Sequence, residues 1–295
     1  MNEQLPRSAA LVVNAKSRNG QEAFREACRL LTEAGVELVS AVAVRDPDHL
    51  TTKVCEAVRD GAPMVIVGGG DGSLSSSVDH LVGTDAVFAI LPLGTANSFS
   101  RTVEIPLDVA GAVKVIAEGK PHRIDLGMID DDYFVNCAAI GISPLIAETV
   151  PHGLKKRLGR PGYLAWAAVQ MARFKPFRLF VEDDAGKIHE MNALEVRIAN
   201  GRYHGGTELV ETSVDDGEIV VQAIEGRARS KLLWSWGLSL LGPDKVRGTV
   251  REFRGRRFRI RTDPPLPISI DGEVLAKTPV MARVAHRVIT MAVPR

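Results

Sequence analysis

The sequence has few cysteines, no excess of either charge and no long hydrophobic run. Its three cysteines, Cys28, Cys55 and Cys137, include no C-x-x-C pair, which argues against a disulfide framework or a zinc site and favours a reducing cytoplasm. The first ten residues lack the apolar core of a signal peptide. The longest apolar stretch, residues 232–241, is about half of the ~20 residues that cross a bilayer. We therefore expect a cytoplasmic protein, and any contact with the inner membrane surface is expected to be peripheral.

Charge and aromatic content limit the classes of partner. The formal net charge is +1, so the molecule as a whole does not attract nucleic acid. Aromatic residues make up 5% of the chain, and they do not interleave with basic residues as a base-stacking surface requires. We expect no nucleic-acid partner, and an anionic ligand must be held by a local group of residues.

The first part of the chain has the pattern of repeated strand–helix units. A chain of 295 residues exceeds the usual size of one core, so two domains are expected. Apolar runs alternate with amphipathic stretches, which predicts a Rossmann-like parallel sheet covered by helices. Asp48 and Ser73 are expected N-caps. The predicted strands are residues 9–14, 37–44, 63–67 and 87–91, and the predicted helices are residues 20–34, 48–60, 73–82 and 107–118.

After about Arg123 the pattern changes to period-two alternation with frequent turn pairs, which predicts an antiparallel β-sandwich. Its main helix is expected at residues 161–174. The domain limits that follow are residues 1–125 and 126–295, and the C-terminal strand, within residues 281–295, could return to the first domain. The predicted strands are residues 133–137, 177–182, 193–199, 218–224, 256–261, 268–270 and 288–293.

A glycine-rich loop follows the third predicted strand. Residues 68–73 read Gly-Gly-Gly-Asp-Gly-Ser and precede a predicted helix. Backbone N–H groups at a helix start form an anion site at the carboxyl edge of a parallel sheet, and glycine lets phosphate oxygens approach. Asp71 stands where a carboxylate can hold Mg²⁺ against phosphates. No G-K-[ST] follows, which excludes a Walker A loop, and a dinucleotide G-x-G-x-x-G frame would need glycine at Ser73.

A second loop, Pro-Leu-Gly-Thr-Ala-Asn at residues 92–97, follows the next predicted strand. Carboxyl ends of neighbouring parallel strands meet at one edge, so the two loops together predict a bipartite nucleotide site.

Together these motifs resemble those of the diacylglycerol kinase catalytic domain family, which also includes sphingosine kinases and bacterial lipid kinases. Further matches are Gly205-Gly206, residues 213–218 and the Asp-Gly-Glu of residues 271–273, followed by Thr278-Pro279. NAD kinases and phosphofructokinases resemble the first motif but lack the later ones as arranged here. The resemblance spans nearly the whole chain.

The resemblance implies an ATP-dependent lipid kinase with Mg²⁺ as cofactor, acting on a diacylglycerol-like membrane lipid. It implies Glu273 as general base and Asp71 as the second catalytic residue, and a structural Mg²⁺ held by Asp216 with the backbone of Ser213 and Glu218. Whether the chain forms a homodimer is left open. The residues it assigns to the nucleotide are Gly69, Gly70, Asp71, Gly72, Ser73, Leu74, Ser75, Gly94, Thr95 and Asn97.

Three positions depart from the family pattern. Ser75 and Ser76 replace an amide and a carboxylate, and Ser98 replaces an aspartate. These changes keep two alternatives open, a soluble kinase of the NAD kinase type and a catalytically silent nucleotide- or lipid-binding regulator.

Two regions could dock on lipid. One combines Lys155, Lys156, Arg157 and Arg160 with the apolar residues Tyr163, Leu164, Trp166 and Met171. The other combines Leu232, Leu233, Trp234 and Trp236 with the basic residues 245–261. Apolar residues at helical spacing more often face a core, and the alternation around Arg259 is typical of the solvent face of a strand.

Overall fold

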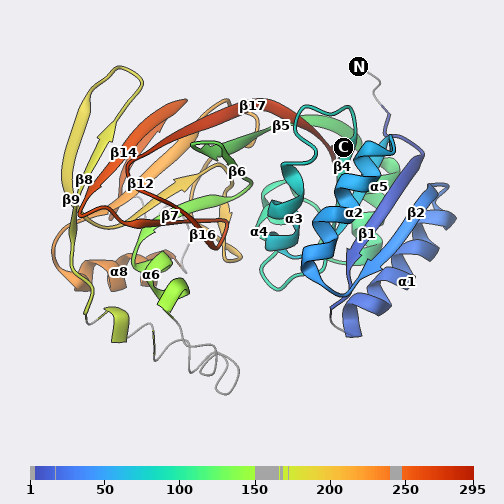
Figure 1. Ribbon diagram of the computed structural model, residues 1–295, viewed down its shortest axis with the longest axis horizontal. Coiled ribbons are helices and arrows are strands. Elements are labelled where there is room, and N and C mark those ends of the chain that lie inside the picture. The colour runs from blue at the N-terminus through green and yellow to red at the C-terminus, as the bar shows by residue number, and fades with distance from the viewer. Residues whose placement is uncertain (1–3, 17, 150–165, 167–168, 172, 240–247) are drawn as a thin grey trace.

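The computed structural model describes residues 4–16, 18–149, 166, 169–171, 173–239 and 248–295. The molecule has two lobes, side by side in Figure 1, with both chain ends on the first. Each lobe has its own apolar core, one built mainly from residues 5–135 and the other from residues 129–282.

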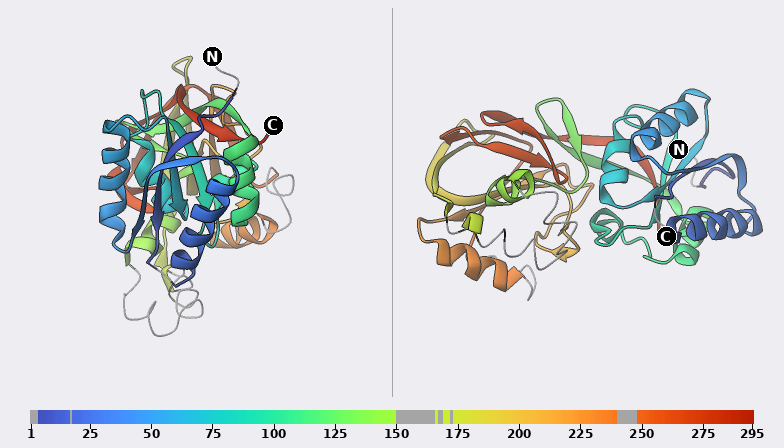
Figure 2. Two further views of the ribbon diagram at one scale, coloured as in Figure 1. Left: turned by 90° about the vertical axis from the view of Figure 1, so that its right-hand side faces the viewer. Right: turned by 60° about the horizontal axis from the view of Figure 1, so that its bottom comes forward.

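The first lobe is the predicted parallel sheet covered by helices on both faces (Figures 1 and 2). Its strands lie in the order β2-β1-β3-β4, and β3 and β4 are buried along their whole length, as expected when helices cover both faces. The strands are β1 (Ser8–Asn14), β2 (Glu37–Val44), β3 (Met64–Gly69) and β4 (Val87–Pro92), and the helices are α1 (Arg18–Glu33), α2 (Pro47–Arg59), α3 (Asp71–Val78), α4 (Ser98–Thr102) and α5 (Val109–Glu118).

The predicted caps of two helices are wrong. α2 begins at Pro47, so Asp48 lies inside it. α3 begins at Asp71 with Gly70 as N-cap, and no side chain caps it. Because glycine has no side-chain acceptor, the first N–H groups of α3 keep their hydrogen-bonding capacity.

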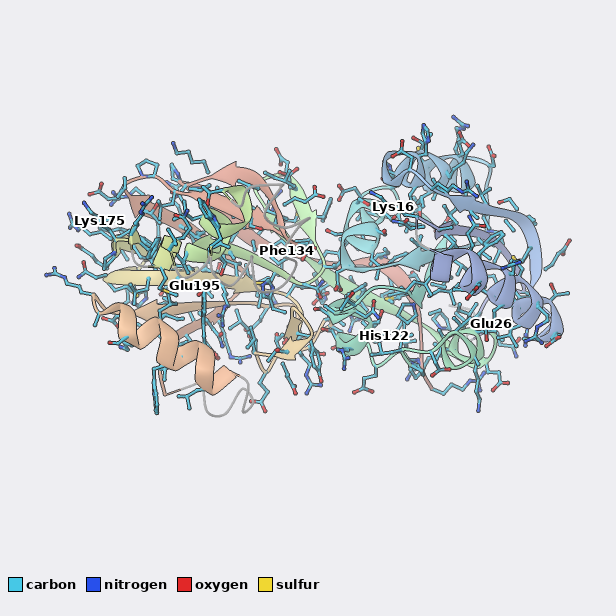
Figure 3. The ribbon with its side chains drawn as sticks, turned by 90° about the horizontal axis from the view of Figure 1, so that it is seen from below. Lys16, Glu26, His122, Phe134, Lys175 and Glu195 are labelled. Atoms are coloured by element: carbon cyan, nitrogen blue, oxygen red, sulfur yellow. The ribbon has the colours of Figure 1, made fainter. Side chains whose placement is uncertain are left out.

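The second lobe is an antiparallel sheet curved into a sandwich, with α6 and α8 along one side (Figure 1). Its elements are β6 (Asp132–Phe134), β7 (Cys137–Gly141), α6 (Ile142–Thr149), β8 (Phe177–Glu182), β9 (Ile188–Ala199), β10 (Tyr203–His204), β11 (Thr207–Glu208), β12 (Ile219–Glu225), α8 (Arg229–Ser239), β13 (Arg251–Gly255), β14 (Arg257–Asp263), β15 (Pro267–Ile270) and β16 (Glu273–Lys277). The predicted helix at residues 161–174 lies mostly outside the described residues. Figure 3 shows Phe134 and Glu195 in this lobe and Lys16 and His122 in the first.

One predicted strand is wrong in extent. Residues 133–137 were expected to form a single strand, but β6 ends at Phe134 and β7 begins at Cys137. The backbone N–H groups of residues 135–137 donate to the carboxylate of Asp271, so they cannot continue one strand's ladder.

Two long strands join the lobes. β5 (Lys120–Ile129) pairs antiparallel with β17 (Val280–Val293) along nearly its whole length. Near the chain end, Thr290 and Met291 of β17 pair in parallel with β4, which confirms that the C-terminal strand returns to the first domain. Because β5 crosses residue 125, we propose that the domain boundary lies within this strand.

The buried carboxylate of Asp125 stabilises the β5–β17 pair where it passes between the two lobes. The β5–β17 register shifts between Ala285 and Ile289, opposite Asp125. The Asp125 carboxylate accepts hydrogen bonds of 2.7 Å from the backbone N–H groups of Gly217 and Arg287, and it lies 2.8 Å from Nδ1 of His286. Its side chain is 1% exposed, so these donors replace its lost hydration.

Asp125→Ala should therefore lower the free energy of unfolding by about 2–3 kcal/mol, because two buried N–H groups lose their acceptor. Urea unfolding followed by circular dichroism measures the change. Asp131→Ala, which removes a fully exposed carboxylate 3.7 Å from Arg283, is the matched control and should leave stability unchanged. Equal unfolding midpoints for the two variants would contradict the role of Asp125.

Candidate active site

The two glycine loops touch each other at the carboxyl edge of the sheet. Gly69 at the end of β3 is the register partner of Pro92 at the end of β4, which places the loops that follow side by side. A Cβ atom on Gly94 would lie 2.5 Å from Cα of Gly70, closer than real Cβ atoms approach a backbone. Glycine at residue 94 is therefore needed for the two loops to pack.

The start of α3 offers free backbone N–H groups toward open space. The first helical bond runs from the N–H of Leu74 to the carbonyl of Gly70, at 3.1 Å. The N–H groups of Asp71, Gly72 and Ser73 precede it at the positive end of the helix. A Cβ atom on Gly72 would meet nothing within 4 Å. A phosphate group can therefore approach this backbone directly.

Several predicted nucleotide residues also hold the loops in shape. Asn97 has φ 48° and uses its side-chain amide to bond both the N–H and the carbonyl of Gly94, at 2.8 and 2.9 Å. Ser73 Oγ accepts a hydrogen bond from Asn14 Nδ2 at 3.1 Å. Leu74 is fully buried in the first core, so its side chain supports the loop from beneath. Thr95 is exposed at the loop tip.

The carboxylate of Asp71 is suited to bind a hard cation. Its Oδ1 accepts a hydrogen bond of 3.0 Å from the N–H of Phe99 in α4, which fixes the carboxylate between the two loops. No hydrogen bond or ion pair joins Oδ2 to another described residue. Mg²⁺ commonly uses one or two carboxylates and completes its shell with water and substrate phosphates, so the position of Asp71 beside the phosphate loop fits this cation.

A second carboxylate, that of the half-buried Asp271, connects the lobes. Asp271 and Gly272, with φ of 46° and 102°, form the two-residue turn between β15 and β16, the geometry of a type I′ hairpin. Ser75 Oγ of α3 donates to Asp271 Oδ2 at 2.7 Å. Burial raises the pKa of Asp271, against the lowering effect of its hydrogen bonds. No local sequence pattern indicates that Asp271 bonds to Ser75, which lies 196 residues away in the chain.

This link places Glu273 and the phosphate loop around one cavity of about 260 Å³. Glu273 is exposed and begins β16. Gly72, next to Asp71, lies on the opposite wall. The residues that line the cavity are Thr51, Gly72, Ser75, Ser76, Asp79, His80, Asp132, Tyr133, Ile270, Asp271, Glu273 and Leu275.

The serines that depart from the family pattern make new contacts. Besides the Ser75–Asp271 bond, Ser98 Oγ accepts a hydrogen bond of 3.0 Å from the N–H of Gly206 in the second lobe. Ser76 is exposed and donates to the carbonyl of Ser73 at 3.3 Å. Ser75 and Ser98 therefore each form a hydrogen bond between the first lobe and the second.

Two further residues near the site were not singled out from the sequence. Asn14, which positions Ser73, ends β1 at the same edge of the sheet, and this shared edge was an available signal. His204 lies on β10, which packs against α4. Burial lowers the pKa of His204, the nearby Arg197 guanidinium lowers it further, and neighbouring carboxylates oppose this. The imidazole is therefore neutral near pH 7.

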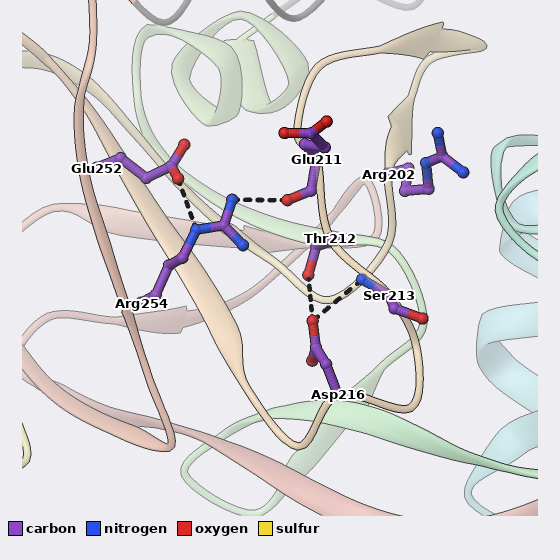
Figure 4. Close-up of a pocket in the computed structure, with 7 residues that line it drawn as sticks. All are labelled: Arg202, Glu211, Thr212, Ser213, Asp216, Glu252 and Arg254. Atoms are coloured by element: carbon purple, nitrogen blue, oxygen red, sulfur yellow. Dashed lines mark hydrogen bonds and ion pairs between the residues drawn. The ribbon is translucent and has the colours of Figure 1, made fainter.

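Ser213 and Asp216 of the predicted structural Mg²⁺ loop line another pocket, shown in Figure 4, which shares no lining residue with the cavity at Glu273. Asp216 Oδ2 accepts from Thr212 Oγ1 at 3.3 Å and from the N–H of Ser213 at 3.2 Å, and Oδ1 accepts from the N–H of Glu218 at 3.0 Å. Both carboxylate oxygens thus brace their own loop. Among the described residues no group of three or more His, Cys, Asp or Glu side chains is arranged as a metal cluster. Asp216 still adds an oxygen donor of the kind that Mg²⁺ uses.

The predicted lipid-docking regions are described only in part. Residues 155–157, 160, 163 and 164 lie outside the described residues. Leu232 is fully buried and Trp236 Nε1 donates to Glu195 at 2.7 Å, whereas Trp234 is 65% exposed. In β14 the arginines alternate with buried residues, which confirms the predicted solvent face. In the part of the chain that the structure covers, no helix combines the length and apolar character that crossing a bilayer requires.

Two family models together match nearly the whole chain. Residues 8–129 match the model of the diacylglycerol kinase catalytic domain, and residues 137–293 match that of the YegS C-terminal NAD kinase beta sandwich-like domain. A Klebsiella pneumoniae protein named "probable lipid kinase YegS-like" is 30% identical over 275 residues, which cover 91% of this chain and 90% of that protein. A Xanthomonas campestris protein of the same name is 32% identical over 282 residues, with coverages of 89% and 88%.

A solved structure shares the fold. A crystal structure described as a diacylglycerol kinase from Bacillus anthracis superposes with a TM-score of 0.74 at 19% identity, covering 99% of this chain and 98% of that chain. The expected combination of a parallel-sheet domain and a β-sandwich domain is thereby confirmed.

Proposed function

Because the chain belongs to the diacylglycerol kinase catalytic domain family and is a phosphotransferase with an alcohol acceptor, we propose that it transfers the γ-phosphate of ATP to the hydroxyl of diacylglycerol. The product is phosphatidic acid. The observation that carries this proposal is the cavity lined on one side by Gly72 of the phosphate loop and on the other by Glu273. An acceptor hydroxyl in this cavity can meet both a base and a bound phosphate.

Each residue has a defined task in this proposal. The free N–H groups at the start of α3 and the loop of Gly94 and Thr95 bind the phosphates of ATP. Asp71 would hold the Mg²⁺ that neutralises phosphate charge when bound. Asp216, with the backbone of Ser213 and Glu218, would hold a separate structural Mg²⁺. Glu273 removes the proton of the acceptor hydroxyl as its oxygen bonds to the γ-phosphorus and the bond from that phosphorus to ADP breaks. Ser75 and Asp271 hold the two walls in register.

The charge of the cavity favours a neutral acceptor. Among the described residues, its lining includes the carboxylates of Asp79, Asp132, Asp271 and Glu273 and one titratable base, His80. Burial raises the pKa of Asp79, the nearby His80 opposes this, and the Asp132 carboxylate raises the pKa further. Like charges repel across short distances, so a lipid with an anionic headgroup beside its hydroxyl is disfavoured. Diacylglycerol is neutral, and this distinguishes it from anionic alternatives such as phosphatidylglycerol.

Asp132→Asn should weaken this selection. Removing one exposed carboxylate from the cavity wall reduces repulsion by about 1 kcal/mol or less, so kcat/KM for phosphatidylglycerol should rise by up to ~5-fold relative to diacylglycerol. Parallel assays of both lipids in mixed micelles measure this ratio. Asp131→Asn, which changes the neighbouring residue outside the cavity lining, is the matched control. An unchanged ratio in Asp132→Asn would contradict the electrostatic argument.

A kinase assay of the purified protein tests the function itself. With radiolabelled ATP, Mg²⁺ and a panel of lipids in micelles, we expect label to enter phosphatidic acid when diacylglycerol is supplied. Transfer to NAD without detergent would instead indicate a soluble NAD kinase activity. Nucleotide binding without turnover on any acceptor would indicate a silent regulator. Sedimentation with vesicles tests the proposed peripheral contact with membrane.

A further inference from the structure

An exposed leucine stands beside the proposed base. Leu275 is 57% exposed and lies two residues after Glu273 on β16. The β15–β16 register passes from Val274 to Ala276, so Leu275 has no partner residue in it. Both Glu273 and Leu275 line the cavity that contains Gly72. Scattered exposed leucines are normal on protein surfaces. This one lies within the cavity where the acceptor hydroxyl must enter.

The apolar side chains of the cavity lining come from the second lobe. They are Tyr133, Ile270 and Leu275, and the carboxylates of Asp132, Asp271 and Glu273 stand beside them. Gly72, Ser75 and Ser76 of α3 line the facing side. An amphiphile can therefore place its carbon skeleton against Leu275 with its hydroxyl toward the phosphate loop, and Glu273, on the same strand as Leu275, can reach that hydroxyl.

The strand that carries Leu275 lies at an edge of the large sheet. Among the described strands β16 pairs with β15, and it packs against α6. Charged residues, Glu273 and Lys277, stand at its two ends, whereas Val274 and Leu275 between them are apolar and exposed, at 36% and 57%. Leu275 belongs to the cavity lining and Val274 does not. Val274 is therefore a neighbouring exposed apolar residue against which the role of Leu275 can be compared.

We propose that Leu275 is a specificity-determining residue that contacts the acyl-bearing part of the lipid acceptor next to its hydroxyl. This inference rests on the proposed function. Contact with Leu275 removes apolar surface of both partners from water and seats the hydroxyl at Glu273. The acceptor class is a neutral, hydroxyl-bearing amphiphile whose apolar chains begin within a few bonds of the hydroxyl. A polar acceptor gains nothing from this contact.

The test compares Leu275→Ser with Val274→Ser. For dioleoylglycerol in mixed micelles, Leu275→Ser should lower kcat/KM about tenfold, through KM, since burying such a side chain is worth about 1.5 kcal/mol or more. Leu275→Met should retain activity. With glycerol as a chain-free acceptor at high concentration, Leu275→Ser should match the unaltered protein. Val274→Ser should resemble the unaltered protein with both acceptors.

A binding measurement separates this inference from the proposed function. Fluorescence titration with a pyrene-labelled diacylglycerol, in the presence of a non-hydrolysable ATP analogue, should show the same loss of affinity in Leu275→Ser only. If no protein turns over any lipid but this loss is seen, the assigned reaction fails and the contact stands. If Leu275→Ser and Val274→Ser give equal affinities and equal kcat/KM values, the contact is refuted while the kinase assignment is unaffected.

Discussion

Replacing Glu273 by glutamine is expected to lower kcat by about 10²- to 10⁴-fold, the range that a positioned general base contributes. Glutamine keeps the size and polarity of the side chain but cannot accept the hydroxyl proton. Glu273 is exposed at the start of β16 and no described residue forms an ion pair with it, so its loss should not unfold the hairpin. Affinity for ATP should stay unchanged, because the phosphate loop lies on the other wall.

The measurement is single-turnover transfer of radiolabelled phosphate to diacylglycerol, alongside ATP binding and thermal unfolding. Lys277→Gln, which changes a charge on the same strand outside the cavity lining, is the control and should retain full activity. Full turnover in Glu273→Gln would refute the assigned base. A parallel fall in ATP affinity would show instead that the residue acts through the nucleotide site.

The second large effect is expected where the glycine loops touch. Gly94→Ala would place a methyl group 2.5 Å from Cα of Gly70 and 2.7 Å from Oδ1 of Asn97. The nearest atom is the backbone Cα of Gly70, which cannot move as freely as a side chain. The two loops must therefore separate, which lowers the free energy of unfolding by about 1–3 kcal/mol. The N–H groups at the start of α3 then lose their alignment with the second loop, and ATP affinity should fall by more than tenfold.

Gly72→Ala is the matched comparison in the same motif. A methyl group there meets no atom within 4 Å, so the unfolding midpoint should stay or rise slightly, as for other unstrained glycine-to-alanine changes. The methyl group nevertheless occupies the space through which phosphate oxygens approach, so ATP affinity should fall. Calorimetric titration and urea unfolding of both variants measure the two effects. Undiminished ATP binding in Gly72→Ala would contradict phosphate binding at this helix start.

The sequence predicted those features that depend on residues close together in the chain. The alternation of strands and helices in residues 9–118 follows from local hydrophobic periodicity, and the structure reproduces it within a few residues. The two glycine loops were placed correctly at neighbouring strand ends, because a parallel sheet brings successive carboxyl ends to one edge. The helix ending at Gly119 before Pro121 was likewise readable from local chemistry.

Local patterns failed where a distant partner determines the conformation. The segment around Val135 reads as one strand, yet the carboxylate of Asp271 takes its N–H groups and breaks it. The length of β17 and its pairing with β5 were missed, since an antiparallel partner more than 150 residues away leaves no periodic signal. Ser75 and Ser98 replace polar residues of the family pattern and were interpreted as lost contacts. In the structure each forms a hydrogen bond with the other lobe.

The phosphate loop and the two-domain class came from the sequence alone, because glycine content and apolar spacing express their chemistry locally. The candidate base Glu273 came from the resemblance to the kinase family. Only the tertiary structure decided that Glu273 and Gly72 line the same cavity and that Leu275 joins them there. The physical reason is that the half-buried carboxylate of Asp271 accepts hydrogen bonds from two separate segments of the chain, Ser75 of α3 and residues 135–137. These hydrogen bonds fix how the two lobes meet.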